Sequence, residues 1–216
     1  LTLALERLAP VYQTVRLVKA ALDPSVTFLG FAGSPWTVAT YMISGQGSKD
    51  HAEPRKLAYQ NPQAFAALID RISDLTVDYL SGQIRAGVDA VQLFDSWAGS
   101  LAPAQFEQWV IAPTAKLVAA LRDFSVADQC TGVDAVGVDE SIDPYWAHEA
   151  LPAHMPVQGN LDPMALVAGG TALQEAVTHI RKAFAGRPHI FNLGHGIVPE
   201  APIAHVEALL AQLRGG

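Results

Sequence analysis

The sequence contains two nearly identical hexapeptides, Ala86-Gly87-Val88-Asp89-Ala90-Val91 and Thr131-Gly132-Val133-Asp134-Ala135-Val136. Each copy has the pattern expected where a helix ends, a glycine caps it and a β-strand follows. Repetition of this joint is typical of folds in which strands and helices alternate, either a (β/α) barrel or an open doubly wound sheet. We favour the barrel, in the form of an incomplete (β/α)8 barrel of the TIM type.

The rest of the chain continues this alternation. Five short runs rich in β-branched or apolar residues are predicted to form parallel strands. They are Val26–Phe31, Ala90–Phe94, Ala135–Val138, Pro156–Asn160 and His189–Leu193. A complete barrel uses about 31 residues per βα unit, so 216 residues hold about seven units at best. An incomplete barrel would leave strand edges unpaired unless another subunit covers them.

Helix-start signals lie between the predicted strands. Asn61-Pro62 provides a cap and a first-turn proline for a helix with apolar residues at three- and four-residue steps. Another helix is predicted to start at Pro103 and to bend or break near Pro113. Thr171 and Gln174 have the spacing of a capping box at the start of a further helix.

Composition limits the possible function classes. Half of the residues are apolar, 16% are charged and the formal net charge is −7. These values favour one folded domain over residues 1–216 and argue against disorder and against nucleic acid or anionic membranes as partners. No apolar run approaches the roughly 20 residues of a membrane span, and the first residues lack an export signal. The single cysteine, Cys130, fits a reducing cytoplasm.

Polar residues follow the predicted strands, at the edge where reactive groups gather in parallel α/β folds. The segments are Ser34-Pro35-Trp36, Asp95-Ser96-Trp97, Asp139-Glu140-Ser141, Asn160-Leu161-Asp162 and Gly194-His195-Gly196. Many such residues only cap the next helix, and we expect this of Asp162, which precedes Pro163.

His195 differs from these because glycines on both sides leave room for a ligand or another chain to approach. Its imidazole could donate a hydrogen bond to a carboxylate or transfer a proton, and the alternative is a buried structural histidine. The other histidines form no i,i+4 pair, no HExxH motif and no pairing with cysteine, so no metal site is predicted.

Four motifs together resemble the uroporphyrinogen decarboxylase family. They are Phe31-Ala32-Gly33-Ser34-Pro35-Trp36-Thr37 with Thr40-Tyr41-Met42, Gln92-Leu93-Phe94-Asp95-Ser96-Trp97-Ala98-Gly99, Gln158-Gly159-Asn160-Leu161-Asp162-Pro163 and Asn192-Leu193-Gly194-His195-Gly196-Ile197-Val198-Pro199. The resemblance implies a cytoplasmic enzyme of tetrapyrrole synthesis, a homodimeric (β/α)8 barrel that needs no cofactor and no metal. Such an enzyme removes carbon dioxide from the four acetate side chains of uroporphyrinogen III and forms coproporphyrinogen III.

The resemblance also implies three substrate-binding residues, Tyr41, Ser96 and His195. A phenol, a hydroxyl and an imidazole can each donate a directed hydrogen bond to a substrate carboxylate. Phe94 would offer an apolar face to the macrocycle. During the reaction of such an enzyme a pyrrole ring is protonated on carbon, and the cationic ring takes up electrons as carbon dioxide leaves.

The chain also departs from the family pattern. The family's arginine-rich segment and its strand ending in an aspartate do not occur in the sequence, so no catalytic residue is assigned. We expect about two N-terminal strands to be missing, and a further segment between Phe124 and Thr131. Asp95, Asp139 and Glu140 would repel an octacarboxylate. These features predict a decarboxylase by descent with weak or no activity.

Two alternatives remain open from the residues. The first is a non-catalytic fragment or pseudoenzyme that binds a tetrapyrrole or a partner subunit. The second is a relative of the cobalamin-dependent methyltransferases, which bind zinc through histidine and more than one cysteine. The single Cys130 argues against the second alternative.

Overall fold

The computed structural model describes residues 2–45, 50–122 and 133–215. Contacts within the chain divide it into two compact units, Leu1–Gly132 and Val133–Gly216. In the described residues each unit has its own parallel sheet and its own buried apolar cluster. The single domain over residues 1–216 remains a prediction.

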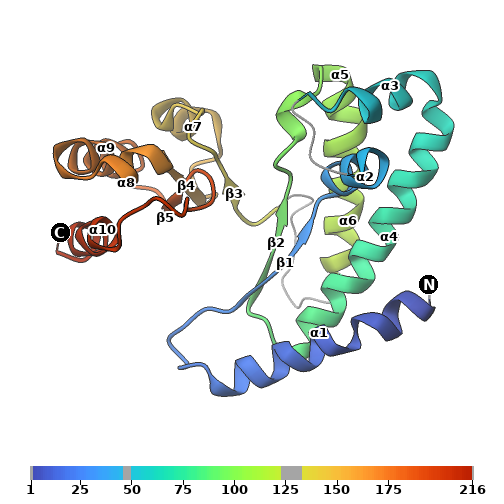
Figure 1. The fold of residues 1–216 in the computed structure, drawn as a ribbon, viewed down its shortest axis with the longest axis horizontal. Helices are drawn as coiled ribbons and strands as arrows, with labels where there is room; N and C mark the ends of the chain where they lie inside the picture. The colour runs from blue at the N-terminus through green and yellow to red at the C-terminus, as the bar shows by residue number, and fades with distance from the viewer. Residues whose placement is uncertain (1, 46–49, 123–132, 216) are drawn as a thin grey trace. The chain divides into compact units, whose positions relative to one another are not determined.

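The sheet of unit 1 consists of two parallel strands, β1 (Leu29–Gly33) and β2 (Ala90–Phe94) (Figure 1). β2 has the bounds predicted from the sequence, whereas β1 starts three residues later than predicted. The later start has a physical cause, because Asp23 holds the preceding residues in a turn. The Val26 amide donates to the Asp23 carbonyl at 2.9 Å, which keeps Val26 out of the strand.

Helix α4 (Pro62–Ala86) packs against both strands of this sheet. Its buried side chains form much of the apolar core of unit 1. The predicted cap is confirmed: the Asn61 side chain accepts a hydrogen bond from the Ala64 amide at 3.1 Å. The helix ends at Gly87, whose φ of 111° is left-handed. The first hexapeptide therefore forms the predicted helix–glycine–strand joint. In the second copy, Thr131 and Gly132 lie outside the described residues.

The other helices described in unit 1 are α1 (Thr2–Ala21), α2 (Pro35–Ser44), α3 (Ala52–Gln60), η1 (Ala98–Ser100), α5 (Pro103–Phe106), η2 (Glu107–Ile111) and α6 (Ala112–Arg122). Of these, α1, α2, α3 and α6 pack against α4. The irregularity predicted near Pro113 takes the form of a π-helical turn in η2, where the Ala112 amide donates to the Glu107 carbonyl. Because Pro113 has no N–H for the Trp109 carbonyl, the regular α-helical pattern cannot continue there.

Unit 2 contains three parallel strands in the order β3 (Val136–Gly137), β4 (Val157–Leu161) and β5 (His189–Leu193). Its helices are α7 (Pro144–Ala150), α8 (Pro163–Ala168), α9 (Gly170–Ala183) and α10 (Ile203–Arg214). Buried side chains of β4, α8 and α9 form the centre of its core. All strand pairs of the described chain are parallel and no closed barrel is present among them, which agrees with the predicted incomplete (β/α)8 barrel.

Two helix starts in unit 2 test the sequence predictions. Asp162 caps α8 as predicted, since its side chain accepts from the Met164 amide at 2.7 Å. The predicted capping box of Thr171 and Gln174 is not formed, because α9 begins at Gly170 and Gly169 is its N-cap residue. Gly169 has a φ of 66° and packs against the His205 ring, so this glycine turn sets the start of α9.

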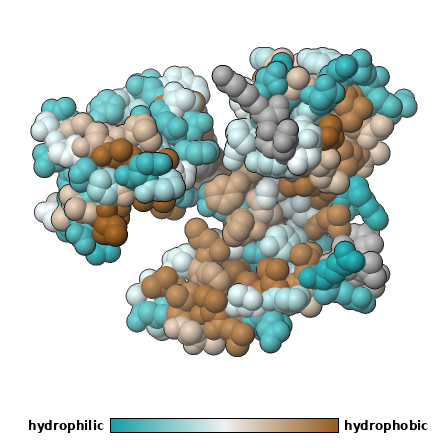
Figure 2. Space-filling view, viewed as in Figure 1, coloured by the Kyte–Doolittle hydropathy of each residue, from teal (hydrophilic) through white to brown (hydrophobic). Residues whose placement is uncertain are grey.

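Hydrophobic side chains remain on the surface of both units. In Figure 2 they gather over α1, where Leu17 and Val18 are exposed. Strand residues Leu29 and Phe31 in unit 1 and Ile190 in unit 2 are exposed as well. None of the helices in the described ranges is both long enough and apolar enough to span a membrane.

Candidate functional site

Asp95, the first residue after β2, joins the end of this strand to the start of α2. Thr37 Oγ1 donates to Asp95 Oδ1 at 2.6 Å, and Ser34 Oγ donates to Asp95 Oδ2 at 2.5 Å. The Ser34 amide also donates to the Phe94 carbonyl at 2.8 Å. Ser34 and Thr37 are buried, so these bonds lie away from solvent. They fix the first turn of α2 against β2.

Burial raises the pKa of Asp95 above its ordinary value, and the hydrogen bonds from Ser34 and Thr37 offset part of this rise. Ser34 and Thr37 each donate a hydroxyl hydrogen bond to this carboxyl group, so Asp95 holds the start of α2 at the end of β2.

Tyr41 and Ser96 lie on the two elements that Asp95 joins. Tyr41 is one turn beyond Thr37 on α2, and 46% of its surface is exposed. Ser96 is exposed and directly follows Asp95. The ring of Tyr41 meets the ring of Trp97, the neighbour of Ser96, edge-on with a centroid distance of 6.3 Å. The structure thus brings two of the three predicted substrate-binding residues to the carboxyl end of β2.

His51, the residue before α3, supports this arrangement and was missed by the sequence analysis. It is buried, and its ring lies 4.7 Å from the ring of Trp97. Trp36 Nε1 donates to the Trp97 carbonyl at 3.1 Å. Trp97 is therefore held from two sides while it contacts Tyr41.

Phe31 and Phe94 form an exposed apolar surface on the two strands. Their rings meet edge to face, with centroids 5.9 Å apart and an interplanar angle of 77°. The exposed fractions are 59% for Phe31 and 46% for Phe94. Aromatic faces of this kind bind flat apolar ligands through buried area and ring contact.

His195 belongs to unit 2, where it follows β5 and is exposed, so its alternative interpretation as a buried structural histidine is wrong. The preceding Gly194 packs against the chain at Glu140: a Cβ on Gly194 would lie 2.3 Å from the Glu140 nitrogen. The loop after β3 thus occupies the space that this glycine leaves. A common pocket for Tyr41, Ser96 and His195 remains a prediction.

Two other polar segments at strand ends have structural roles. The side-chain amide of Asn160 donates through Nδ2 to the main-chain carbonyls of Asp139 and Ile142, at 2.9 and 2.7 Å. Asp139 accepts from the amide and the hydroxyl of Ser141. These bonds hold the loop between β3 and α7 on β4.

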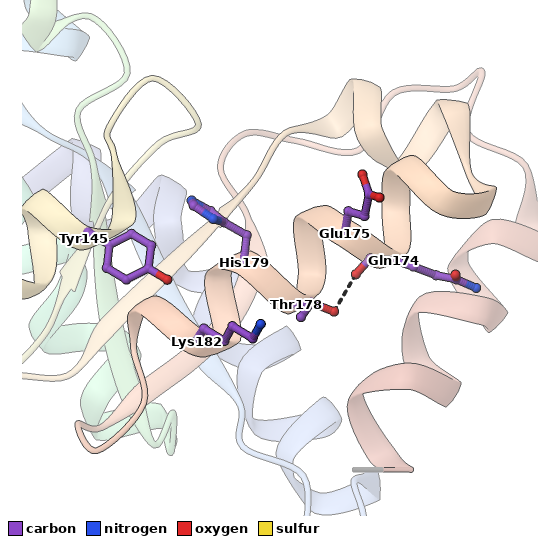
Figure 3. Close-up of a pocket in the computed structure, with 6 residues that line it drawn as sticks. All are labelled: Tyr145, Gln174, Glu175, Thr178, His179 and Lys182. Atoms are coloured by element: carbon purple, nitrogen blue, oxygen red, sulfur yellow. Dashed lines mark hydrogen bonds between the residues drawn. The ribbon is translucent and has the colours of Figure 1, made fainter.

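A hollow of about 420 Å³ in unit 2 lies between α7 and α9 (Figure 3). Tyr145 lines it from α7 and contacts His179 of α9, with ring centroids 5.2 Å apart. None of Tyr41, Ser96 and His195 lines this hollow. We therefore take the carboxyl end of β2, near Tyr41 and Ser96, as the candidate site.

Comparison with known proteins decides the family. A sequence model of the family described as uroporphyrinogen decarboxylase (URO-D) matches residues 2–215. The chain belongs to the uroporphyrinogen decarboxylase family. It is 61% identical to uroporphyrinogen decarboxylase of Sphingopyxis alaskensis, with 98% of this chain and 67% of that protein covered. It is 60% identical to the enzyme of Rhizorhabdus wittichii, with 97% and 66% covered.

The chain therefore spans about two thirds of the length of the curated uroporphyrinogen decarboxylases that it matches. The first alignment runs over 229 positions although the chain has 216 residues, so at least 13 positions have no counterpart in this chain. Such positions agree with the expected internal shortening. The predicted place of that shortening, Phe124 to Thr131, lies outside the described residues.

Among solved structures, a methyltransferase from Methanosarcina mazei has a similar fold. The TM-score is 0.80 at 18% sequence identity, with 97% of this chain and 64% of that chain covered. At this identity the likeness concerns the fold alone. Family membership therefore favours the uroporphyrinogen decarboxylase interpretation over both alternatives raised from the sequence.

Proposed function

We propose that this chain acts as a uroporphyrinogen decarboxylase, which converts uroporphyrinogen III to coproporphyrinogen III. The observation that carries the proposal is the 61% identity to a curated uroporphyrinogen decarboxylase over 98% of this chain. The exposed Tyr41 and Ser96 at the end of β2 support it, because both can donate hydrogen bonds to carboxylates.

In the proposed reaction the chain binds and orients the tetrapyrrole. Tyr41, Ser96 and His195 donate hydrogen bonds to substrate carboxylates, and Phe94 lies against the macrocycle. A pyrrole ring protonated on the ring carbon next to the one that bears the acetate arm accepts the electron pair of the breaking C–C bond. Carbon dioxide leaves and an exocyclic methylene forms. This methylene carbon takes up a proton to become a methyl group, and the ring carbon loses the proton that it had gained.

The resemblance also supports three further parts of the proposal: a homodimer, a cytoplasmic location and a reaction without cofactor or metal. A second subunit would help to cover the exposed Leu29 and Ile190. Sedimentation of the purified protein would test the homodimer, for which we expect twice the chain mass.

The proposed reaction is tested by incubating the purified protein with uroporphyrinogen III in the absence of oxygen. Porphyrins with successively fewer carboxylates are then separated by chromatography after oxidation. We expect products down to the tetracarboxylate, which would contradict the weak or absent activity predicted from the departures of the sequence, and less product in Ser96→Ala. Tetrapyrrole binding without conversion would contradict the proposed reaction and support non-catalytic binding. If the protein neither binds nor converts uroporphyrinogen, a tetrapyrrole is not its substrate.

A further inference from the structure

Gln83, near the end of α4, makes an unusual contact with strand β1. Its side chain is buried, with 3% of the residue exposed. The Phe31 amide donates to Gln83 Oε1 at 3.1 Å, and Gln83 Nε2 donates to the Phe31 carbonyl at 3.1 Å. One side-chain amide thus satisfies both main-chain groups of a strand residue.

These two bonds lie at the edge of β1 that faces away from β2. Even-numbered residues of this segment bond toward β2: the Asp89 amide donates to the Phe28 carbonyl, and the Ser34 amide donates to the Phe94 carbonyl. Since successive residues of a strand in a parallel ladder bond to opposite sides, the main-chain groups of Phe31 point to the other edge. Gln83 occupies the place there that a neighbouring strand would take.

The approach of Gln83 requires Gly30. A Cβ on Gly30 would lie 2.7 Å from Gln83 Oε1, so a larger residue would push the amide away from the strand. The Phe31 side chain, in contrast, is 59% exposed and its ring rests against Phe94. The backbone of Phe31 is therefore fixed from the helix side while its ring faces outward.

We propose that Gln83 is a positioning residue, which holds Phe31 so that the Phe31–Phe94 pair presents a fixed apolar face to the tetrapyrrole. This inference rests on the proposed function. Gln83 does not touch the substrate in this account and acts only through the strand. Without it, both main-chain groups of Phe31 lose the partner that Gln83 provides at this edge, and β1 shifts to regain hydrogen bonds.

The test compares Gln83→Met with Ser81→Ala. Ser81 lies two residues earlier on α4, is also 3% exposed, and its hydroxyl has no partner among the described residues. For Gln83→Met we expect KM for uroporphyrinogen to rise about 5–10-fold with kcat changed less than about twofold, because an apolar face binds substrate and transition state alike. Ser81→Ala should leave both parameters unchanged.

Hydrogen exchange at the Phe31 amide provides a second measurement, which does not depend on activity. We expect exchange to become at least about tenfold faster in Gln83→Met and to be unchanged in Ser81→Ala. Gln83→Asn serves in place of Gln83→Met if that variant does not fold, because it keeps an uncharged amide but is one methylene shorter and cannot hold both main-chain groups of Phe31. It should also raise KM and speed the exchange of the Phe31 amide.

An unchanged KM together with faster exchange would overturn the inference, since the contact would then be structural only. Unchanged exchange would overturn it as well. If wild-type protein neither binds nor converts a tetrapyrrole, the proposed function fails and the inference falls with it. That outcome differs from the other two because it is seen without any substitution.

Discussion

Thr37 Oγ1 donates a 2.6 Å hydrogen bond to Asp95 Oδ1, which joins the first turn of α2 to the end of β2. Tyr41 follows on the same helix and Ser96 follows on the same strand end. The position of the two predicted substrate-binding residues relative to each other thus depends on a bond between two residues that need not touch substrate themselves.

The first prediction concerns this bond. Asp95→Ala removes the acceptor of two buried hydroxyls and should lower the free energy of unfolding by about 2–4 kcal/mol. Thr37→Val should lower it by about 1 kcal/mol. Urea unfolding followed by tryptophan fluorescence measures both. In the double variant the losses should be smaller than additive, and strict additivity would show that the two side chains do not interact.

The second prediction is the pH dependence that Asp95 produces. Burial raises its pKa in the folded protein, so between pH 3.8 and that raised pKa the folded state binds more protons than the unfolded state. The contribution of Asp95 to stability is therefore full below pH 3.8 and is lost as pH rises through the raised pKa. The free energies of unfolding of wild type and Asp95→Asn, plotted against pH, should diverge in this window. Parallel plots would refute the raised pKa of Asp95.

The third prediction concerns His189 in unit 2, which should make the protein less stable as pH falls rather than as pH rises. Burial lowers the pKa of His189, while the Gly159 carbonyl, 2.7 Å from its Nε2, works against that shift. The unfolded state then binds more protons between the lowered pKa and pH 6.5. Stability should decrease as pH falls below 6.5, and His189→Gln should remove this part of the decrease. The measurement is the difference in unfolding free energy between the two proteins at each pH.

The fourth prediction concerns Arg187, a buried cation that donates to three carbonyls. Its guanidinium contacts the carbonyl oxygens of His148, Pro152 and Met155 at 2.8–2.9 Å. Arg187→Met should lower the free energy of unfolding by about 3–5 kcal/mol, because these acceptors lose their donor at a buried position. Arg181→Met, a change at an exposed arginine of α9, is the control and should cost less than about 1 kcal/mol. Equal losses in urea denaturation would contradict the role of Arg187.

Local sequence signals predicted the regular elements well. β2 and β5 have the predicted bounds, and Asn61 and Asp162 cap helices as expected, because an apolar run or a cap residue before proline acts within a few residues. The start of β1 and the start of α9 were predicted wrongly. In both cases a neighbouring turn, at Asp23 or at Gly169, decides the boundary.

The contacts that organise the site could not be predicted in this way. Asp95 and Thr37 are 58 positions apart, and Gln83 and Phe31 are 52 positions apart, so no local pattern joins them. Tyr41, Ser96 and His195 were singled out through the family resemblance. Their residue types suit carboxylate binding, but the same types are common on any protein surface.

The affinity for uroporphyrinogen of three single variants, Tyr41→Phe, Ser96→Ala and His195→Gln, tests the central claim most directly. Tyr59→Phe, a change at an exposed tyrosine on α3, is the control. If the three side chains bind one tetrapyrrole, each variant should weaken binding about 10–150-fold, the loss of one hydrogen bond to a charged group, and the control should not. Wild-type affinity in all three variants would contradict the account.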